Sequence, residues 1–142
     1  MKIVSYNVNG IRAAITKGFV PWLAANDFDI VCIQETKAQE EQVDVSELEA
    51  LGYSCYWFSA QKKGYSGVAV FTKLNPKNLI KGQANEHSDF EGRTLQLEFE
   101  NFTLINTYFP SGSSGDDRQI FKYQFLDNYL DFRKSFLDKT LI

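Results

Sequence analysis

The run Ile30-Val31-Cys32-Ile33 constrains the fold of this 142-residue chain more than any other feature. Four consecutive apolar residues, most of them β-branched, predict a strand that is buried on both faces. The run ends at four polar residues, Gln34-Glu35-Thr36-Lys37. A buried strand with a polar end and a helix after it is the layout in which sites form at the carboxyl ends of strands. We therefore expect a layered α/β domain with functional residues at that edge.

Hydrophobic patterns elsewhere predict a mixture of hairpin and crossover connections. Further strands are expected over residues 3–8, 53–59, 67–72, 93–100 and 102–109, the last two forming a hairpin. Helices are expected over residues 12–26, interrupted near Gly18 and Pro21, and over 45–51 and 116–137. In the strand 93–100, Leu95, Leu97 and Phe99 are expected to face inward and Gln96 and Glu98 outward. The length predicts that residues 1–142 form one unit.

Composition and charge exclude several classes of protein. A 44% share of hydrophobic residues is enough for a core and excludes intrinsic disorder. No apolar run approaches the ~18 residues of a membrane span, so we expect no membrane partner. The net charge of -3 means that any polyanion would have to be bound by a local basic patch or through metal ions. Cys32 and Cys55 lack metal or redox spacing and predict buried free thiols in a cytoplasmic protein.

Two polar segments lie where predicted strands end. Asn7 and Asn9 lie at the end of the first strand; taken alone they are typical turn formers, although their amides could also bind a ligand. Glu35, directly after the buried strand, is either an incidental surface residue or a ligand for a hard cation such as Mg²⁺, and the sequence leaves both open.

Two further segments could contact a phosphate. Residues 62–68 combine two lysines, two glycines and Tyr65, which is typical of a surface loop but also of a loop that binds phosphate through its backbone. Tyr108 closes a strand before Pro110; such a tyrosine usually serves packing, but it could present its phenol to a phosphate.

Taken together and in this order, these segments resemble one family, the exonuclease III / AP endonuclease nucleases of the endonuclease–exonuclease–phosphatase superfamily. The matching segments span residues 5–110 and are Ser5-Tyr6-Asn7-Val8-Asn9-Gly10-Ile11-Arg12-Ala13, Ile33-Gln34-Glu35-Thr36-Lys37, Gly64-Tyr65-Ser66-Gly67-Val68-Ala69, Glu91-Gly92-Arg93 and Tyr108-Phe109-Pro110. Several ordered matches are far more specific than any one of them.

The resemblance implies a fold, a function and a site. The fold would be half of a four-layered α/β sandwich with a mixed, largely antiparallel sheet. The function would be Mg²⁺- or Mn²⁺-dependent hydrolysis of double-stranded DNA in base excision repair, as a 3′-to-5′ exonuclease, an abasic-site endonuclease or both. Glu35 and Asn7 would bind the metal, meeting at the rim of adjoining strands, and Tyr108 would be the catalytic tyrosine. The positions that would approach the DNA backbone are Asn9, Arg12, Lys37, Gly64 and Tyr65.

The chain matches only the first half of that family's domain. The family's later Gly-Asp-x-Asn segment, a further aspartate and an Asp-His pair have no counterpart in residues 1–142, and the one histidine, His87, is expected in an exposed loop. We therefore expect little activity from the chain alone. We also expect an uncovered apolar sheet face, and with it self-association or pairing with a missing C-terminal half. The alternatives are a superfamily phosphatase acting on inositol phosphates or lipids, and a non-catalytic nucleic-acid-binding module.

Overall fold

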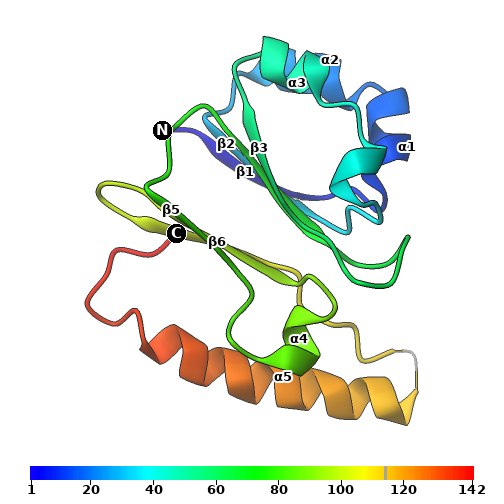
Figure 1. Cartoon of the computed structure of the whole chain (residues 1–142), viewed down its shortest axis with the longest axis vertical. Coiled ribbons are helices and arrows are strands. Elements are labelled where there is room, and N and C mark those ends of the chain that lie inside the picture. Colours follow the sequence, from blue (N-terminus) through cyan, green and yellow to red (C-terminus); the bar gives the residue numbers. More distant parts are fainter. Residues whose placement is uncertain (114) are drawn as a thin grey trace.

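The computed structural model describes residues 1–113 and 115–142 as two β-sheets stacked between two layers of helices (Figure 1). The elements in chain order are β1 Ile3–Asn7, α1 Ile11–Thr16, α2 Phe19–Asn26, β2 Ile30–Gln34, the 3₁₀ helix η1 Glu40–Gln42, α3 Ser46–Ala50, β3 Ser54–Phe58, β4 Val68–Thr72, β5 Asn78–Lys81, α4 Glu86–Asp89, β6 Thr94–Glu98, β7 Thr103–Thr107 and α5 Asp116–Lys134. The four layers implied by the resemblance are all present.

The first sheet has the strand order β1-β2-β4-β3, with β1 parallel to β2 and the other pairs antiparallel. Its central strand β2 is buried on both faces, as the apolar run predicts. Val31 and Ile33 pack in the core under α1, α2 and α3, whereas Ile30 and Cys32 pack against the second sheet. The alternation of successive side chains between the two faces explains why every position in this run is apolar.

The second sheet is antiparallel, has the order β5-β6-β7 and includes the predicted hairpin. Helix α5 covers its outer face (Figure 1), where Phe125 is buried and packs edge-on against Phe109. Gln96 points outward from the sheet pair, as predicted, but this outer face is itself covered. The Gln96 side chain is therefore buried, and its Nε2 donates to the Gly82 carbonyl at 2.8 Å.

In residues 1–113 and 115–142 the expected uncovered sheet face is absent, because the chain contributes strands to both sheets. Their inner faces pack against each other through one continuous set of buried residues, Ile30, Cys32, Val68, Val70, Leu95, Leu97, Phe99 and Leu104. The chain therefore supplies strands to both sheets of the sandwich, and not one sheet with its covering helices.

Among the described residues each sheet has two edge strands, β1 and β3 in the first sheet and β5 and β7 in the second. Among the described residues, β1 pairs with β2 alone. The outer side of β7 carries only a parallel bridge from Thr103 to Leu141, extended by a 3.0 Å bond from Ile105 N–H to the Ile142 carbonyl. Since β7 lies over β2 and β4, and β6 over β4 and β3, the edge strands β1 and β7 are on the same side of the molecule.

The helices begin and end near the predicted positions. The first helical segment breaks at Gly18, where φ is 97°, but the second helix begins at Phe19, before Pro21, because proline is tolerated in a first turn. Helix α5 ends at Lys134, and Leu137 beyond it is exposed. None of the helices in residues 1–113 and 115–142 has the length and apolar character needed to cross a bilayer.

Both cysteines are free thiols, as predicted. Cys32 is buried and Cys55 is partly buried, and burial raises the pKa of each thiol to about 12. Neither thiol is therefore ionised near neutral pH.

Asn106 joins the two sheets directly beneath the polar end of β2. Its side chain is buried, its Nδ2 donates to the carbonyls of Ile33 (3.0 Å) and Ala69 (2.9 Å), and its Oδ1 accepts from Gln34 Nε2 at 2.7 Å.

Because these bonds satisfy buried polar groups, we expect Asn106→Ala to lower the free energy of unfolding by about 2–4 kcal/mol. Urea denaturation measures this loss. Asn78→Ala, at an exposed asparagine of β5, is the matched control and should change it by less than about 1 kcal/mol. Equal losses in the two variants would contradict a bridging role for Asn106.

Candidate active site

Glu35 lies at the centre of a polar cluster where β1, β2 and β7 end. Its backbone is held on two sides, since Gly10 N–H donates to the Glu35 carbonyl at 2.8 Å and Thr36 N–H donates to the Gly67 carbonyl at 3.1 Å. Glu35 itself adopts a left-handed conformation with φ of 55°, which is uncommon outside glycine. The strained residue is thus fixed by the surrounding loops, as is common at functional sites.

The Glu35 carboxylate receives three hydrogen bonds or ion pairs from different parts of the chain. Asn7 Nδ2 from β1 donates to Oε1 at 2.9 Å, and the Tyr108 hydroxyl, just after β7, donates to the same oxygen at 2.7 Å. The Lys37 ammonium lies 3.0 Å from Oε2. The expected convergence of Asn7 and Glu35 is therefore observed, and Tyr108 joins them.

These contacts fix the protonation states of the cluster. Burial raises the pKa of Glu35, but the hydrogen bonds from Asn7, Tyr108 and Lys37 and the charge of Lys37 outweigh it, so the pKa lies below its usual value. Burial, followed by the hydrogen bond to Glu35 and its charge, raises the pKa of Tyr108 to about 12. Near neutral pH the cluster consequently has an ionised carboxylate and a protonated tyrosine that donates a hydrogen bond to it.

The donor set fits a Mg²⁺ or Mn²⁺ ion at Glu35 in part. One ionised carboxylate, only 19% exposed, agrees with the preference of Mg²⁺ for one or two carboxylates plus water and phosphate oxygens. In the described residues no group of three or more His, Cys, Asp or Glu side chains could hold a metal. Asn7 turns its nitrogen to Glu35, while its Oδ1 accepts from Asn9 N–H at 3.0 Å. In this rotamer Asn7 orients Glu35, and ligation by its oxygen would use the remaining lone pair.

Three of the five predicted DNA-contacting residues lie beside this cluster. Asn9 Oδ1 accepts from the Lys37 ammonium, and Arg12 lines a cavity together with Gly10, Thr36 and Lys37. Lys37 therefore lies next to the carboxylate, and Arg12 lines the same cavity as Lys37, in a chain whose net charge is negative. Such a local basic patch is what the charge balance requires of a polyanion site.

The other two, Gly64 and Tyr65, lie in the loop between β3 and β4. Tyr65 is half-buried and contacts Arg118 and Arg93 through its hydroxyl, and Arg93 in turn contacts Tyr108. Gly64 is exposed with φ of 71°, and none of the side-chain hydrogen bonds of the described residues around Glu35 involves it. His87 is exposed as predicted, but in the short helix α4 and not in a loop.

Sequence reasoning did not identify Gln34 and Asn106 as the support beneath the cluster, or Arg118 as a partner of Tyr65. A signal existed for Asn106, because it is in phase with the inward-facing Leu104 of the same predicted strand. A polar residue at an inward position is expected to bond buried backbone groups. Arg118 had no such signal, since its partners are distant in sequence.

Comparison with known proteins agrees with this geometry. The model of the endonuclease/exonuclease/phosphatase family matches residues 4–141. An exodeoxyribonuclease from Bacillus subtilis (strain 168) is 44% identical over 133 residues, covering 93% of this chain and 52% of that protein. The DNA repair nuclease APEX1 from Danio rerio is 39% identical over 117 residues, covering 81% and 38%. Among solved structures, an AP endonuclease from Archaeoglobus fulgidus is similar with a TM-score of 0.82 and 29% identity, covering 93% and 51%. The chain spans about half the length of these relatives, or less.

Proposed function

Because the chain belongs to the endonuclease/exonuclease/phosphatase family, we propose that it is one half of a metal-dependent nuclease for double-stranded DNA. The reaction would be hydrolysis of phosphodiester bonds at 3′ ends, at abasic sites or at both, in DNA repair in the cytoplasm. The observation that carries the proposal is the cluster of Asn7, Glu35 and Tyr108, which brings side chains from three strand ends to one point beside Lys37 and Arg12. Names of relatives such as exodeoxyribonuclease and DNA repair nuclease support the choice of DNA as substrate.

In this proposal each residue of the cluster has a distinct role. Glu35 would hold Mg²⁺ or Mn²⁺, which when bound neutralises charge developing on the attacked phosphate and on the leaving oxygen. Asn7 keeps Glu35 oriented and has a second amide N–H that can donate to a phosphoryl oxygen. Tyr108 has one O–H proton, which it donates to Glu35 here and could donate to a phosphoryl oxygen instead. Lys37, Arg12, Asn9, Gly64 and Tyr65 would hold the DNA backbone without reading its sequence.

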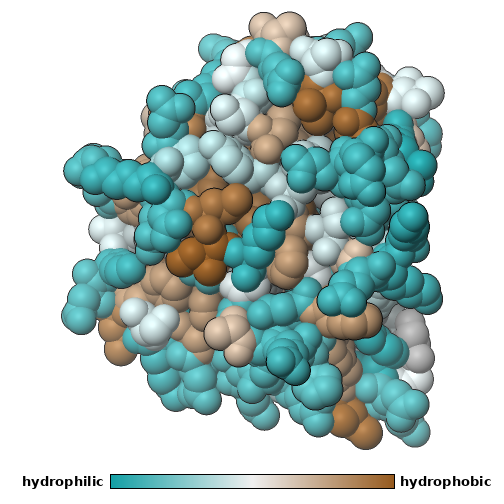
Figure 2. Space-filling model, viewed as in Figure 1, coloured by the Kyte–Doolittle hydropathy of each residue, from teal (hydrophilic) through white to brown (hydrophobic). Residues whose placement is uncertain are grey.

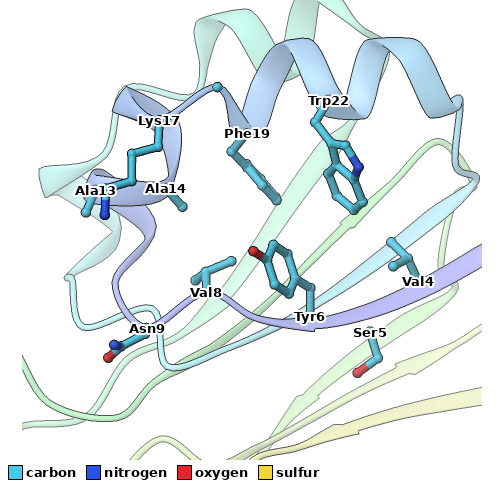
Figure 3. A pocket seen from close by; sticks show the side chains of 11 residues that line it. Val4, Ser5, Tyr6, Val8, Asn9, Ala13, Ala14, Lys17, Phe19 and Trp22 are labelled. Atoms are coloured by element: carbon cyan, nitrogen blue, oxygen red, sulfur yellow. The ribbon is translucent and has the colours of Figure 1, made fainter.

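In this proposal a second half docks on the side of the two sheets where the edge strands β1 and β7 lie. A groove there runs between the β1 edge and the helices α1 and α2, and Figure 3 shows Tyr6, Phe19 and Trp22 gathered around it. Tyr6 is 47% exposed and Trp22 37% exposed. Figure 2 shows hydrophobic side chains in patches on the face it draws, one of them near the C-terminus in this view. A strand added to β1 would pair the unpaired backbone groups of that edge and cover these side chains.

The test joins residues 1–142 to the second half of the Bacillus relative and offers the fusion three substrates. These are duplex DNA with an abasic site, duplex DNA with a recessed 3′ end, and an inositol phosphate, each with Mg²⁺ and with the metal removed by chelation. We expect metal-dependent cleavage of DNA by the fusion, no measurable turnover of the inositol phosphate, and negligible cleavage by residues 1–142 alone. The donated half alone is the control.

The other outcomes contradict the proposal in distinct ways. Hydrolysis of the inositol phosphate in preference to DNA would indicate a phosphatase. A folded fusion that binds duplex DNA without cutting it would indicate a binding module. Cleavage by residues 1–142 alone, at the rate of the fusion, would show that no second half is needed.

A further inference from the structure

Two arginines share one carboxylate beside the candidate active site. Arg93 Nε donates to Glu91 Oε2 at 2.6 Å, and Arg118 from the first turn of α5 donates to both Glu91 oxygens at 2.9 and 3.2 Å. The Arg93 side chain is only 3% exposed and that of Glu91 15%. Burial raises the pKa of Glu91, but the hydrogen bonds and charges of both arginines outweigh it, so the pKa is lowered and Glu91 stays ionised. The negative charge of Glu91 thus balances one of the two arginines, and the trio keeps one positive charge, with the Arg118 side chain 28% exposed to solvent.

Arg93 holds Tyr108 from three directions. Its guanidinium carbon lies 4.7 Å from the centre of the Tyr108 ring, its NH1 donates to the Tyr108 carbonyl at 3.0 Å, and its own carbonyl accepts from Tyr108 N–H at 2.8 Å. A planar guanidinium can stack on a ring and donate sideways at the same time, which an ammonium group cannot do. These contacts therefore help to set the position of the Tyr108 hydroxyl that reaches Glu35.

The same trio reaches Tyr65 in the loop between β3 and β4. Arg118 NH2 donates to the Tyr65 hydroxyl oxygen at 3.0 Å, and Arg93 NH2 lies 3.4 Å from it. Because guanidinium groups only donate, the Tyr65 oxygen accepts here and its own proton stays available for another acceptor. Accepting from a cation also strengthens a hydroxyl as a donor.

We propose that Arg93 and Glu91 are positioning residues for Tyr108, and that Arg118 brings Tyr65 into the same unit. This inference rests on the proposed function, because fixing Tyr108 matters for catalysis only through its contacts with Glu35 and phosphate. A purely structural ion pair would satisfy the buried charges of Arg93 and Glu91 equally well. It does not account for Arg93 also binding the ring and the carbonyl of the tyrosine that completes the site.

The first test is made on residues 1–142 by NMR, without metal or DNA. Its result therefore does not depend on whether the protein is a nuclease. In the unsubstituted chain the Arg93 side-chain N–H signals should exchange slowly and be shifted by the Tyr108 ring, whereas those of the exposed Arg12 should do neither. Exchange of Arg93 as fast as that of Arg12 would overturn the proposal even if no variant folds.

Three variants then separate the members of the unit by their effects on the tyrosine ring signals. Arg93→Lys should shift and broaden the signals of Tyr108, Arg118→Lys should change Tyr65 alone, and Glu91→Gln should change both. Tyr123, exposed on α5, is the internal control and should stay unchanged. Tyr108 signals that are unchanged in folded Arg93→Lys, or changes spread over all tyrosines, would overturn the proposal.

A kinetic test uses the fusion nuclease once its activity is established. Arg93→Lys keeps the charge and should still lower kcat about 10- to 100-fold while KM changes by less than about twofold, because a displaced catalytic group affects the transition state more than binding. A rise in KM with kcat unchanged would assign Arg93 to DNA binding instead and overturn the positioning role.

Discussion

Replacing Glu35 with alanine is expected to reduce the metal-dependent rate of the fusion nuclease by about a thousandfold or more. Glu35 is the one carboxylate in the cluster with Asn7 and Tyr108, and its loss would remove the ligand to the cation together with the group that orients Tyr108. Stability should change little, by about 1 kcal/mol or less, because Glu35 and its partner Lys37 are partly open to solvent. The rate is measured on abasic duplex DNA over a series of Mg²⁺ concentrations.

Two further variants make this result specific to Glu35. Glu35→Gln keeps the size of the side chain and an oxygen that can accept from Tyr108, so a similar loss of rate would show that the charge is what matters. Glu41→Ala removes an exposed carboxylate of η1 and should leave the rate unchanged. If Glu35→Ala kept both the rate and its dependence on Mg²⁺, Glu35 would not be the metal ligand.

The convergence of the site could be predicted from the sequence because it follows from strand geometry. Asn7 and Gln34 are paired across the parallel strands β1 and β2, so the residues at the ends of these strands meet at the same edge. The polar residues directly after two apolar strands therefore had to lie close together. The orientation of the Asn7 amide could not be predicted, because it is set by Asn9 N–H in a turn whose geometry only the folded chain defines.

The distribution of strands between the sheets could not be read from the sequence in the same way. An alternating strand buries one face whichever sheet it joins, so the pattern of residues 93–107 did not reveal that it packs on the first sheet from within the same chain. For the same reason the pattern predicts that Gln96 faces outward but does not show that this face is covered. A covered outer face becomes visible only when α5 is placed over the second sheet.

Gly92→Ala is expected to lower the free energy of unfolding by about 2–4 kcal/mol, a large part of the ~5–15 kcal/mol that stabilises a typical domain. Gly92 has φ of 59°, and a Cβ there would lie 2.5 Å from the carbonyl carbon of Ser59 and 2.6 Å from the Phe58 carbonyl oxygen. Both are backbone atoms, held in place by a 3.1 Å bond from Gln61 N–H to the Phe90 carbonyl. The methyl group therefore adds the cost of overpacking, about 1–3 kcal/mol, to that of a left-handed alanine.

The matched control is Gly52→Ala, which separates these two costs. Gly52 has φ of 88°, but nothing lies within 4 Å of an added Cβ, so we expect a loss of about 1 kcal/mol from the backbone conformation alone. Equal losses at the two positions in urea denaturation would show that the turn at Gly92 moves freely away from residues 58–60. It would then be too loosely held to fix Glu91 and Arg93 on either side of it. A much larger loss at Gly92 would indicate that the backbone of the loop after β3 sets where these two residues, and through them Tyr108, are placed.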